Sequence, residues 1–583
     1  MRPGRTILLI ITLVLANFCM AQQDQVFFSS PGGFYNDSIE LSLDCVYANH
    51  HIRFTTNGNT PTADSRIYEG PMTLDRQLYS SSNIYTIQIS PDDLVYIPDS
   101  VRHAIVIRAA VFDENDSCIS NTSTNTYLIN GVGNTERSLA VMSICADSLA
   151  LFDYETGIFV PGVFFNPDSP NHTGNYYQKG RDWEREVNVE FYEPNNNSGI
   201  NQTCGLRAHG NMSRRYPAKG MKIYARDEYG KKRFNYDFFH DSIVSFKHLI
   251  IKPFAIFEPH LGSQDYFCTT LARQLDVAAP YIRPIQLYLN GEYWGVYFLQ
   301  EKMDERYLED HYDVDPENCN IIGSWLGEVE YGTNVSYSQM ISWFSNADLT
   351  DDMVYEQAYE MIDMHNFIDY YILETFIGNW DWPGNNMRCW QENDGLWQWL
   401  FFDGDATLIN NTSNAFPNAA VFTPPEAWGN HPVDKLLFGQ LLKNSQFRST
   451  FIARATELCN GVFKDDNTFP IFHEIVEILR PRISAQRERF GYPESDNSWN
   501  HWNDVVENYL QHRNQHYLSS MNDFFTTVDV KEDYDLPYLF PSGGFLVYDM
   551  KGNLISRHAL PSKLAAGIYL IVSGNKTQRI IIQ

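Results

Sequence analysis

The stretch Asn379-Trp-Asp-Trp-Pro-Gly-Asn-Asn386 and the segment Trp397-Gln-Trp-Leu-Phe-Phe-Asp-Gly-Asp405 indicate how this chain is organised. Both place carboxylates and carboxamides among aromatic residues, where a charged group is costly unless it is paired or binds a cation. Residues 364–378, just before them, carry apolar side chains at helical spacing and end at a glycine. Asp381 is therefore predicted on a loop that directly follows a buried helix.

Two strands are predicted after this loop. Residues 387–391 and 397–402 flank the turn sequence Asn393-Asp-Gly395, which is a strong hairpin signal. We expect Asp403 and Asp405 to end the second strand, with both carboxylates on one side because strand side chains alternate with period two. Asx turns and helix caps use the same residue types, so a purely structural role stays open as an alternative.

The residue types suit phosphoryl transfer. That reaction needs a carboxylate to orient the attacking hydroxyl and hard oxygen ligands for the metal ions that neutralise the phosphates. Asp381 and Asn386 have the spacing of the Asp and Asn in a protein-kinase catalytic loop, and Asp403 or Asp405 takes the place of the metal-binding Asp that follows. We therefore expect a nucleotide–metal site.

Four blocks, in order along the chain, carry a family resemblance. They are Gly210-Asn-Met-Ser-Arg214 with Pro217-Ala-Lys219, Tyr288-Leu-Asn-Gly-Glu-Tyr-Trp-Gly-Val-Tyr297 with Glu301, Asn379-Trp-Asp381 with Asn385-Asn386, and Phe402-Asp-Gly-Asp405. From about Leu139 to about Phe525 the chain resembles the spore-coat-H (CotH) family of atypical, secreted protein kinases. The resemblance implies a kinase-like fold, ATP with Mg²⁺ or Mn²⁺, and phosphorylation of Ser or Thr on exported proteins.

The resemblance also implies roles for residues. Asp381 would be catalytic, and Asn386, Asp403 and Asp405 would be metal ligands. Gly404 stands where an apolar or aromatic residue is expected between the two acids, which leaves open which aspartate is the main ligand.

The nucleotide is expected to meet several other residues. Backbone N–H groups and Arg214 in the loop with Gly210 and Ser213 could cradle phosphates, although a surface turn is an alternative. Lys219 and Lys222 are three residues apart on a predicted strand, so only one of them can face the cleft. The Pro-x-Lys register favours Lys219. Glu301 begins the predicted link between two lobes, where adenine usually binds, or alternatively belongs to a helix cap.

The composition, the net charge and the N-terminal segment together indicate a folded, exported, multidomain α+β protein. The chain has 583 residues, 43% hydrophobic and 14% aromatic, which suffices for about three or four domains. Its net charge of -29 argues against nucleic acid or an anionic membrane as a partner.

Residues 1–21 combine early arginines, a short apolar core and Ala21 before the cut, as a secretory signal peptide does. No span of a bilayer is expected. Export permits disulfides, and Cys45 and Cys118 could form one.

Three domains are expected after the signal peptide. Residues 25–130 read as an immunoglobulin-like β-sandwich that resembles the C-terminal module of chitobiases and hexosaminidases, through Ile52-Arg-Phe-Thr-Thr-Asn-Gly-Asn-Thr-Pro61 and Tyr68-Glu-Gly-Pro71. Residues 138–528 would form the central bilobal kinase-like domain. Within it we expect a helix over residues 265–275 with Asp265 as a cap, a hairpin over 285–300, and amphipathic helices over 431–460, 469–490 and 499–525. Residues 536–583 read as a small β-sandwich that resembles the sorting domain of the Bacteroidota type IX secretion system, through the blocks that begin at Gly544, Leu564 and Arg579.

The function expected from these features is a secreted atypical protein kinase that ends at the cell surface or outside the cell, after passing the periplasm. Its partners would be a Ser/Thr protein substrate of unknown identity and the secretion machinery. Because ATP is scarce outside cells, a degenerate kinase-like fold that acts in surface binding or adhesion is the alternative. Transfer of a nucleotidyl group is a third hypothesis, since the same metal ligands would serve either reaction. No H-E-x-x-H or G-x-S-x-G pattern points to a zinc hydrolase or serine esterase.

Overall fold

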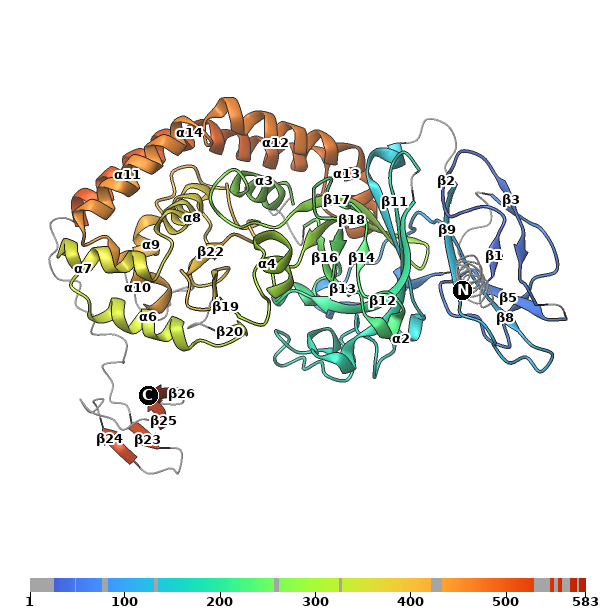
Figure 1. Cartoon of the computed structure of the whole chain (residues 1–583). Helices are drawn as coiled ribbons and strands as arrows, with labels where there is room; N and C mark the ends of the chain where they lie inside the picture. Colours follow the sequence, from blue (N-terminus) through green and yellow to red (C-terminus); the bar gives the residue numbers. More distant parts are fainter. Residues whose placement is uncertain are drawn as a thin grey trace, which may run out of the picture.

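The computed structural model describes most of the chain, in ranges separated by gaps. These ranges are residues 26–47, 49–75, 82–129, 135–196, 198–255, 262–323, 328–420 and 432–528, with the strands 546–549, 554–557, 567–573 and 576–582. The expected signal peptide lies outside them. A β-rich region comes first, a closed β-barrel follows, and helices dominate the part of the chain after the barrel (Figure 1).

The first region consists of short strands, as its alternating, turn-rich sequence predicts. They are β1 (Phe27–Phe28), β2 (Gly33–Tyr35), β3 (Ile39–Leu41), β4 (Leu43–Asp44), β5 (His51–Thr55), β6 (Arg66–Ile67), β7 (Met72–Leu74), β8 (Ile105–Phe112) and β9 (Ser123–Ile129). The largest sheet has the order β2-β9-β8-β5-β6, and β1 pairs with β4 and β3 with β7. One apolar core joins these sheets. Cys45 and Cys118 are free thiols, so the expected disulfide between them is wrong.

Seven strands close into a barrel in the order β10-β11-β12-β13-β16-β18-β17. They are β10 (Ala140–Cys145), β11 (Arg185–Tyr192), β12 (Ser198–His209), β13 (Gly220–Tyr224), β16 (His248–Pro253), β17 (Ile282–Leu289) and β18 (Glu292–Glu301). The predicted hairpin over residues 285–300 is confirmed. Its turn residues, Asn290 and Gly291, have φ of 50° and 84°, as a two-residue hairpin turn between twisted strands requires. The short elements α2 (Ser148–Phe152), β14 (Phe234–Asn235) and β15 (Ser245–Phe246) lie in the connections of the barrel.

The first region is fixed to the barrel through the β17–β18 turn. The Glu292 carboxylate accepts hydrogen bonds from the backbone N–H groups of Ile84 (2.6 Å) and Tyr85 (2.7 Å). The Ala104 N–H donates to the Gly291 carbonyl at 2.7 Å. These bonds satisfy a carboxylate that is fully buried, and they tie a segment beyond β7 to the barrel.

The remaining described part is mainly helical. It contains α3 (Ser263–Ala272), which is inserted before β17, and then α4 (Glu305–Tyr312), β19 (Cys319–Gly323), β20 (Glu328–Tyr331), α6 (Val335–Asn346), α7 (Asp352–Gln357), α8 (Met364–Ile377), β21 (Arg388–Glu392), β22 (Gln398–Leu400), α9 (Phe416–Ala420), α10 (Pro432–Leu441), α11 (Ser445–Asn460), α12 (Asp465–Leu479), α13 (Ile483–Phe490) and α14 (Asp496–Val528). The helical stretches predicted at 364–378, 431–460, 469–490 and 499–525 are confirmed. So is the hairpin through residues 393–395, which joins β21 and β22.

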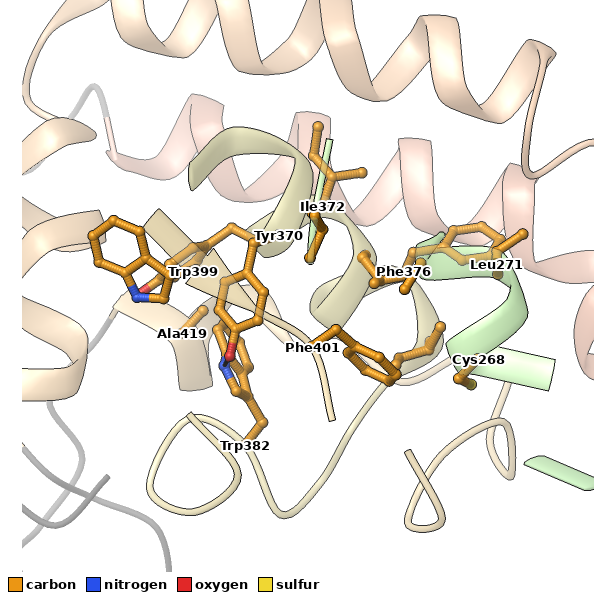
Figure 2. Packing of buried hydrophobic residues seen from close by; sticks show 14 of the residues in the cluster. Cys268, Leu271, Tyr370, Ile372, Phe376, Trp382, Trp399, Phe401 and Ala419 are labelled. Carbon is orange, nitrogen blue, oxygen red and sulfur yellow. Dashed lines mark hydrogen bonds between the residues drawn. The ribbon is translucent and has the colours of Figure 1, made fainter. Parts of the chain in front are cut away.

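Helix α8 is the centre of the helical core. Every one of its residues except His365 is buried, and Asp363 caps its first turn by accepting from the backbone N–H groups of His365 and Asn366. Trp382, Trp399 and Phe401 pack in the same core as α8, so the two segments of interest are anchored by aromatic side chains (Figure 2).

The described strands near the chain end form one antiparallel sheet of order β24-β23-β25-β26. They are β23 (Leu546–Asp549), β24 (Leu554–Arg557), β25 (Gly567–Ser573) and β26 (Lys576–Ile582). The expected second layer of a sandwich is not among the described residues. Within the described ranges, none of the helices combines the length and hydropathy that a membrane span requires.

Candidate active site

The loop that carries Asp381 begins where α8 ends. Gly378 stops the helix in the left-handed conformation, with φ of 66°. Asn379 then donates from Nδ2 to Glu374 Oε2 at 2.9 Å, and its Oδ1 accepts from the Asp381 N–H at 3.2 Å. The backbone of Asp381 is therefore held in place by hydrogen bonds that start from the buried helix.

Two carboxamides contact the Asp381 carboxylate. Asn385 Nδ2 and Asn386 Nδ2 donate to Asp381 Oδ2 at 2.9 Å and 3.3 Å, and Asn386 Nδ2 also lies 3.3 Å from the Asp403 carbonyl oxygen. Asn386 has φ of 55°, which is unusual for a residue other than glycine. The structure thus brings together Asp381 and Asn386, the pair predicted from their spacing, and adds Asn385 to them.

Arg513 on α14 supports this loop from behind. Its guanidinium is 1% exposed and donates to the carbonyls of Thr375 and Phe376 at the end of α8, at 2.6 Å each. It also donates to the carbonyls of Asn411 at 3.0 Å and Ser413 at 2.6 Å. These bonds satisfy carbonyls that a helix end leaves without partners. The far helix α14 therefore fixes the position from which the Asp381 loop starts.

The segment with Asp403 and Asp405 departs from the prediction. Strand β22 ends at Leu400, so neither aspartate is in the strand and the period-two argument for their common side is wrong. Asp403 has φ of 65°, and a turn follows it. The turn lies next to the Asp381 loop, because the Trp380 N–H donates to the Ala406 carbonyl at 3.3 Å.

A lysine that the sequence did not single out joins three parts of the fold. Lys252, on β16 of the barrel, contacts Asp265 Oδ2 at 2.7 Å and Asp403 Oδ1 at 2.5 Å through its Nζ. Asp265 lies on α3, and its other oxygen accepts from the Gly404 N–H at 2.7 Å. The sequence predicts that Asp265 caps α3, but the residue at the N-cap is Gly262. The cap prediction is wrong because Asp265 binds Lys252 and the turn instead.

Close packing explains why residue 404 is a glycine. A Cβ atom at this position would lie 2.9 Å from Cys268 Cβ and 2.9 Å from Phe401 Cζ, which is too close for carbon atoms. The N–H of the same residue is bound to Asp265. A glycine between the two aspartates is therefore what the contact between α3 and the turn requires.

The charges of this cluster influence one another. Burial lowers the pKa of Lys252, but Asp265, Asp403 and Asp405 raise it more, so the pKa lies well above its ordinary range and the lysine is charged. Burial and the neighbouring Asp403 raise the pKa of Asp405, and Lys252 offsets only part of this rise. One ammonium group thus faces several carboxylates. Among the described residues, however, no three His, Cys, Asp or Glu side chains make up a metal-binding group by themselves.

The two candidate lysines differ in where their side chains lie. Lys219 precedes β13, is fully buried, and donates to the Arg214 carbonyl at 2.6 Å. Lys222 lies within β13 between Met221 and Ile223, which fill the barrel. It therefore faces outward, as Lys252 does on the neighbouring strand. In the described part of the chain Lys222 has no hydrogen bond or ion pair, so this lysine, not Lys219, has an ammonium group available to a ligand.

The loop with Gly210 and Ser213 forms a short 3₁₀ helix at Met212–Arg215. The Arg214 guanidinium is buried and donates to the carbonyls of Gly210 at 2.7 Å and Tyr176 at 3.2 Å. Arg214 therefore holds the loop together, and its side chain is not directed to the cluster around Asp381.

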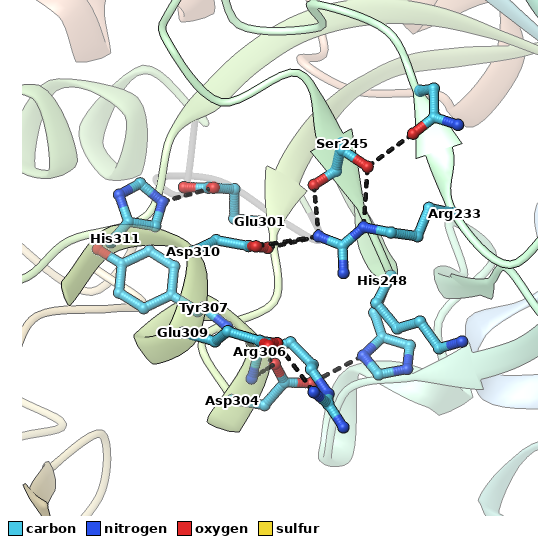
Figure 3. Close-up of polar contacts among 12 residues, drawn as sticks. Arg233, Ser245, His248, Glu301, Asp304, Arg306, Tyr307, Glu309, Asp310 and His311 are labelled. Carbon is cyan, nitrogen blue, oxygen red and sulfur yellow. Dashed lines mark hydrogen bonds and ion pairs between the residues drawn. The ribbon is translucent and has the colours of Figure 1, made fainter. Parts of the chain in front are cut away.

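The segment after β18 is held by its own ion pairs (Figure 3). Glu301, which is 4% exposed, accepts from the Tyr281 N–H and contacts His311 Nε2, each at 2.8 Å. Asp304 caps α4 and contacts His248 on β16 at 2.9 Å. The Glu301 carboxylate thus has partners within the protein, and Figure 3 shows it directed at His311 on α4.

Comparison with known proteins supports part of this picture. Residues 30–87 match the model of the chitobiase/beta-hexosaminidase C-terminal domain. No curated protein matches the chain. Residues 206–517, more than half of the chain, match the model of the CotH kinase protein family, and this match includes Lys252, Asp265, Asp381 and Asp403. The chain therefore belongs to the CotH kinase protein family.

Proposed function

We propose that this protein is a secreted atypical protein kinase that transfers phosphate from ATP to Ser or Thr of exported or surface proteins. The observation that carries the proposal is the Lys252 bridge. It ties a strand of the barrel to Asp265 on α3 and to Asp403 beside the Asp381 loop. Phosphoryl transfer between two lobes uses a lysine and a carboxylate from different parts of the fold, together with an Asp and an Asn on a loop.

Asp381 would act on the acceptor. Its carboxylate is placed to accept the proton of a Ser or Thr hydroxyl while the hydroxyl oxygen forms a bond to the γ-phosphorus and the bond from that phosphorus to the ADP oxygen breaks. The amide groups of Asn385 and Asn386 hold this carboxylate at 2.9 Å and 3.3 Å. The role needs a fixed orientation of the carboxylate, and the hydrogen bonds supply it.

Asn386, Asp403 and Asp405 would hold Mg²⁺ or Mn²⁺. Their oxygens are the hard donors that these ions prefer. Burial and the neighbouring acids raise the pKa of Asp405, and a bound cation would oppose both effects. Three protein donors leave room for oxygens of the substrate, as is usual for Mg²⁺ at phosphates. When bound, the ion would neutralise charge on the phosphates.

The outer face of the barrel would hold the phosphates. Register pairs Arg207 with Lys222, and Lys222 with Ile250, so His209, Lys222 and Lys252 share one face. Burial and the positive charge of Lys302 lower the pKa of Lys222 to about 7. Burial and the positive charges of Lys222, Arg214 and Lys252 lower the pKa of His209. This excess of cations supports an anionic ligand such as a nucleotide phosphate.

The location is part of the proposal and rests on the sequence. The signal-peptide pattern of residues 1–21 supports export, and the sheet at 546–582 is compatible with a sorting domain of the type IX kind. In this proposal the secretion machinery reads the C-terminal domain, and the kinase acts on proteins that share its route.

The test uses the full mature chain with ATP and either Mn²⁺ or Mg²⁺. The wild type is expected to gain mass in steps of one phosphate, and Asp381→Asn is expected to reduce the rate by at least about 100-fold, because general-base and orienting groups contribute on this scale. Asp394→Asn, on the exposed turn of the β21–β22 hairpin, is the matched control and should keep the wild-type rate.

The other outcomes separate the competing functions. Steps of one nucleotide would instead support nucleotidyl transfer by the same residues. A wild type that neither gains mass nor binds ATP with either metal would overturn the enzyme proposal and favour a surface-binding protein.

A further inference from the structure

Trp380 differs from the other tryptophans of the described ranges. More than half of its surface, 56%, is exposed, whereas Asn379 on one side is 2% exposed and Trp382, two residues on, is 1% exposed. Apart from its backbone amide, Trp380 makes no hydrogen bond, ion pair or ring contact in the described part of the chain. Tryptophan is enriched among the residues that contribute most of the binding energy at interfaces.

The exposure does not come from a loosely held loop. The Trp380 N–H is bound to the Ala406 carbonyl at 3.3 Å. On either side, Asn379 is bound to Glu374, and the Trp382 indole N–H donates to the Tyr370 hydroxyl at 2.9 Å. The Trp382 carbonyl in turn accepts from Asn418 at 2.9 Å. The backbone therefore keeps the indole of Trp380 at the surface, on the residue that precedes Asp381 in the chain.

The position of Trp380 decides which ligand it would meet. In the proposed function, the nucleotide phosphates lie against the outer face of the barrel, where Lys222 and Lys252 are. Trp380 belongs to the helical part and adjoins the residue that contacts the acceptor hydroxyl. Successive Cα atoms are about 3.8 Å apart, so an acceptor that reaches Asp381 has its neighbouring residues within range of the indole.

We propose that Trp380 is a specificity residue for the acceptor peptide, and that it stacks on a flat or apolar side chain next to the Ser or Thr that receives phosphate. This inference rests on the proposed function and adds the local chemistry of its substrate. An indole offers an aromatic face for such contacts and loses little conformational freedom when it makes them.

The test uses the full mature chain with ATP and Mn²⁺ and a peptide library that has one fixed Ser and random flanking residues. The phosphorylated peptides are sequenced for the wild type, Trp380→Ala, Trp380→Phe and the control Met353→Ala, a residue of α7 that is 78% exposed. The wild type and M353A are expected to enrich aromatic residues or proline beside the Ser about fivefold, which corresponds to about 1 kcal/mol. W380F should keep part of the enrichment and W380A should lose it.

A kinetic measurement shows which substrate is affected. For one enriched peptide, W380A should raise the KM about fivefold or more while the KM for ATP and the thermal unfolding midpoint stay at the wild-type values. Equal enrichment by the wild type and W380A overturns this inference but not the proposed function. A wild type that phosphorylates neither itself nor any peptide overturns the proposed function, and this inference with it.

Discussion

Replacing Lys252 by methionine is expected to destabilise the protein by about 3 kcal/mol. Methionine keeps most of the length and apolar surface of the lysine stem but removes the ammonium group. Asp265, whose side chain is 2% exposed, would then be a buried carboxylate without its ion-pair partner. Its remaining partner is the Gly404 N–H at 2.7 Å.

The magnitude follows from the burial of each partner. Removing one member of a buried ion pair typically costs about 3–5 kcal/mol, because the other charge stays desolvated. The Lys252 side chain is 20% exposed and that of Asp403 is 38% exposed, so water screens the second contact and its contribution is small. The Lys252–Asp265 contact accounts for nearly all of the effect, which places the estimate at the lower end of that range.

The assay is chemical unfolding of the full mature chain at pH 7.5, followed by intrinsic fluorescence. Lys231→Met removes a charge from an exposed position and should change the free energy of unfolding by less than about 0.5 kcal/mol. Asp265→Asn keeps an acceptor for the Gly404 N–H, so the double variant of Lys252→Met with Asp265→Asn should be more stable than the sum of the single effects by about 2 kcal/mol. Strictly additive effects would refute the reasoning, since they would mean that the two groups do not interact.

Two further predictions concern the same region. Gly404→Ala should lower the free energy of unfolding by about 1–3 kcal/mol, because the added Cβ would lie 2.9 Å from atoms of Cys268 and Phe401. The same change should impair phosphate transfer. An unchanged unfolding curve would contradict this packing. Burial raises the pKa of Glu374 from its ordinary 4.5 to about 8. Folding therefore favours the protonated carboxyl, and this contribution to stability is complete below about pH 4.5. As the pH rises to about 8, the free energy of unfolding falls by roughly 3–5 kcal/mol. Glu374→Gln should remove this fall, whereas Glu356→Gln, at an exposed position, should keep it.

Patterns of local sequence were sufficient for most secondary structure. The helix at 364–377 has apolar side chains around most of its circumference and a glycine at its end, and both signals depend only on neighbouring residues. The turns through Asn290 and Asn393 are equally clear, because both residues adopt a positive φ, which restricts the choice of residue. The spacing of Asp381 and Asn386 likewise survives in the structure as a direct contact.

The sequence could not reveal residues whose contacts join segments that are far apart in the chain. Lys252 and Asp403 are 151 positions apart, and nothing near Lys252 distinguishes it from Lys222 or Lys219 as a ligand-facing lysine. The alternation of β16 could have placed Lys252 outside the barrel, but only the fold brings that face to the Asp381 loop. The prediction that Asp265 caps a helix fails for the same reason, since its partners lie on other elements.

The error at Asp403 has a different cause. Period-two alternation holds only while the chain remains in a strand, and β22 ends three residues earlier, at Leu400. With φ of 65°, Asp403 directs its backbone into a turn, and the turn places its carboxylate at Lys252 and its carbonyl oxygen near Asn386. Glycine at 404 is what permits this turn to approach α3. The departure from the expected family pattern and the failed alternation therefore have one physical origin, which is the tight contact between this turn and α3.

That contact also bears on whether the cluster is a remnant or a working site. Burial and the carboxylates that crowd around one lysine raise the pKa of Asp405, and this crowding opposes folding unless a cation joins the acids. A protein that only binds a partner through its surface gains nothing from this arrangement, and neutral residues would pack there at lower cost. The bonds that maintain it come from the barrel, from α3 and from α8. Their joint presence supports the proposal that the acids take part in a reaction.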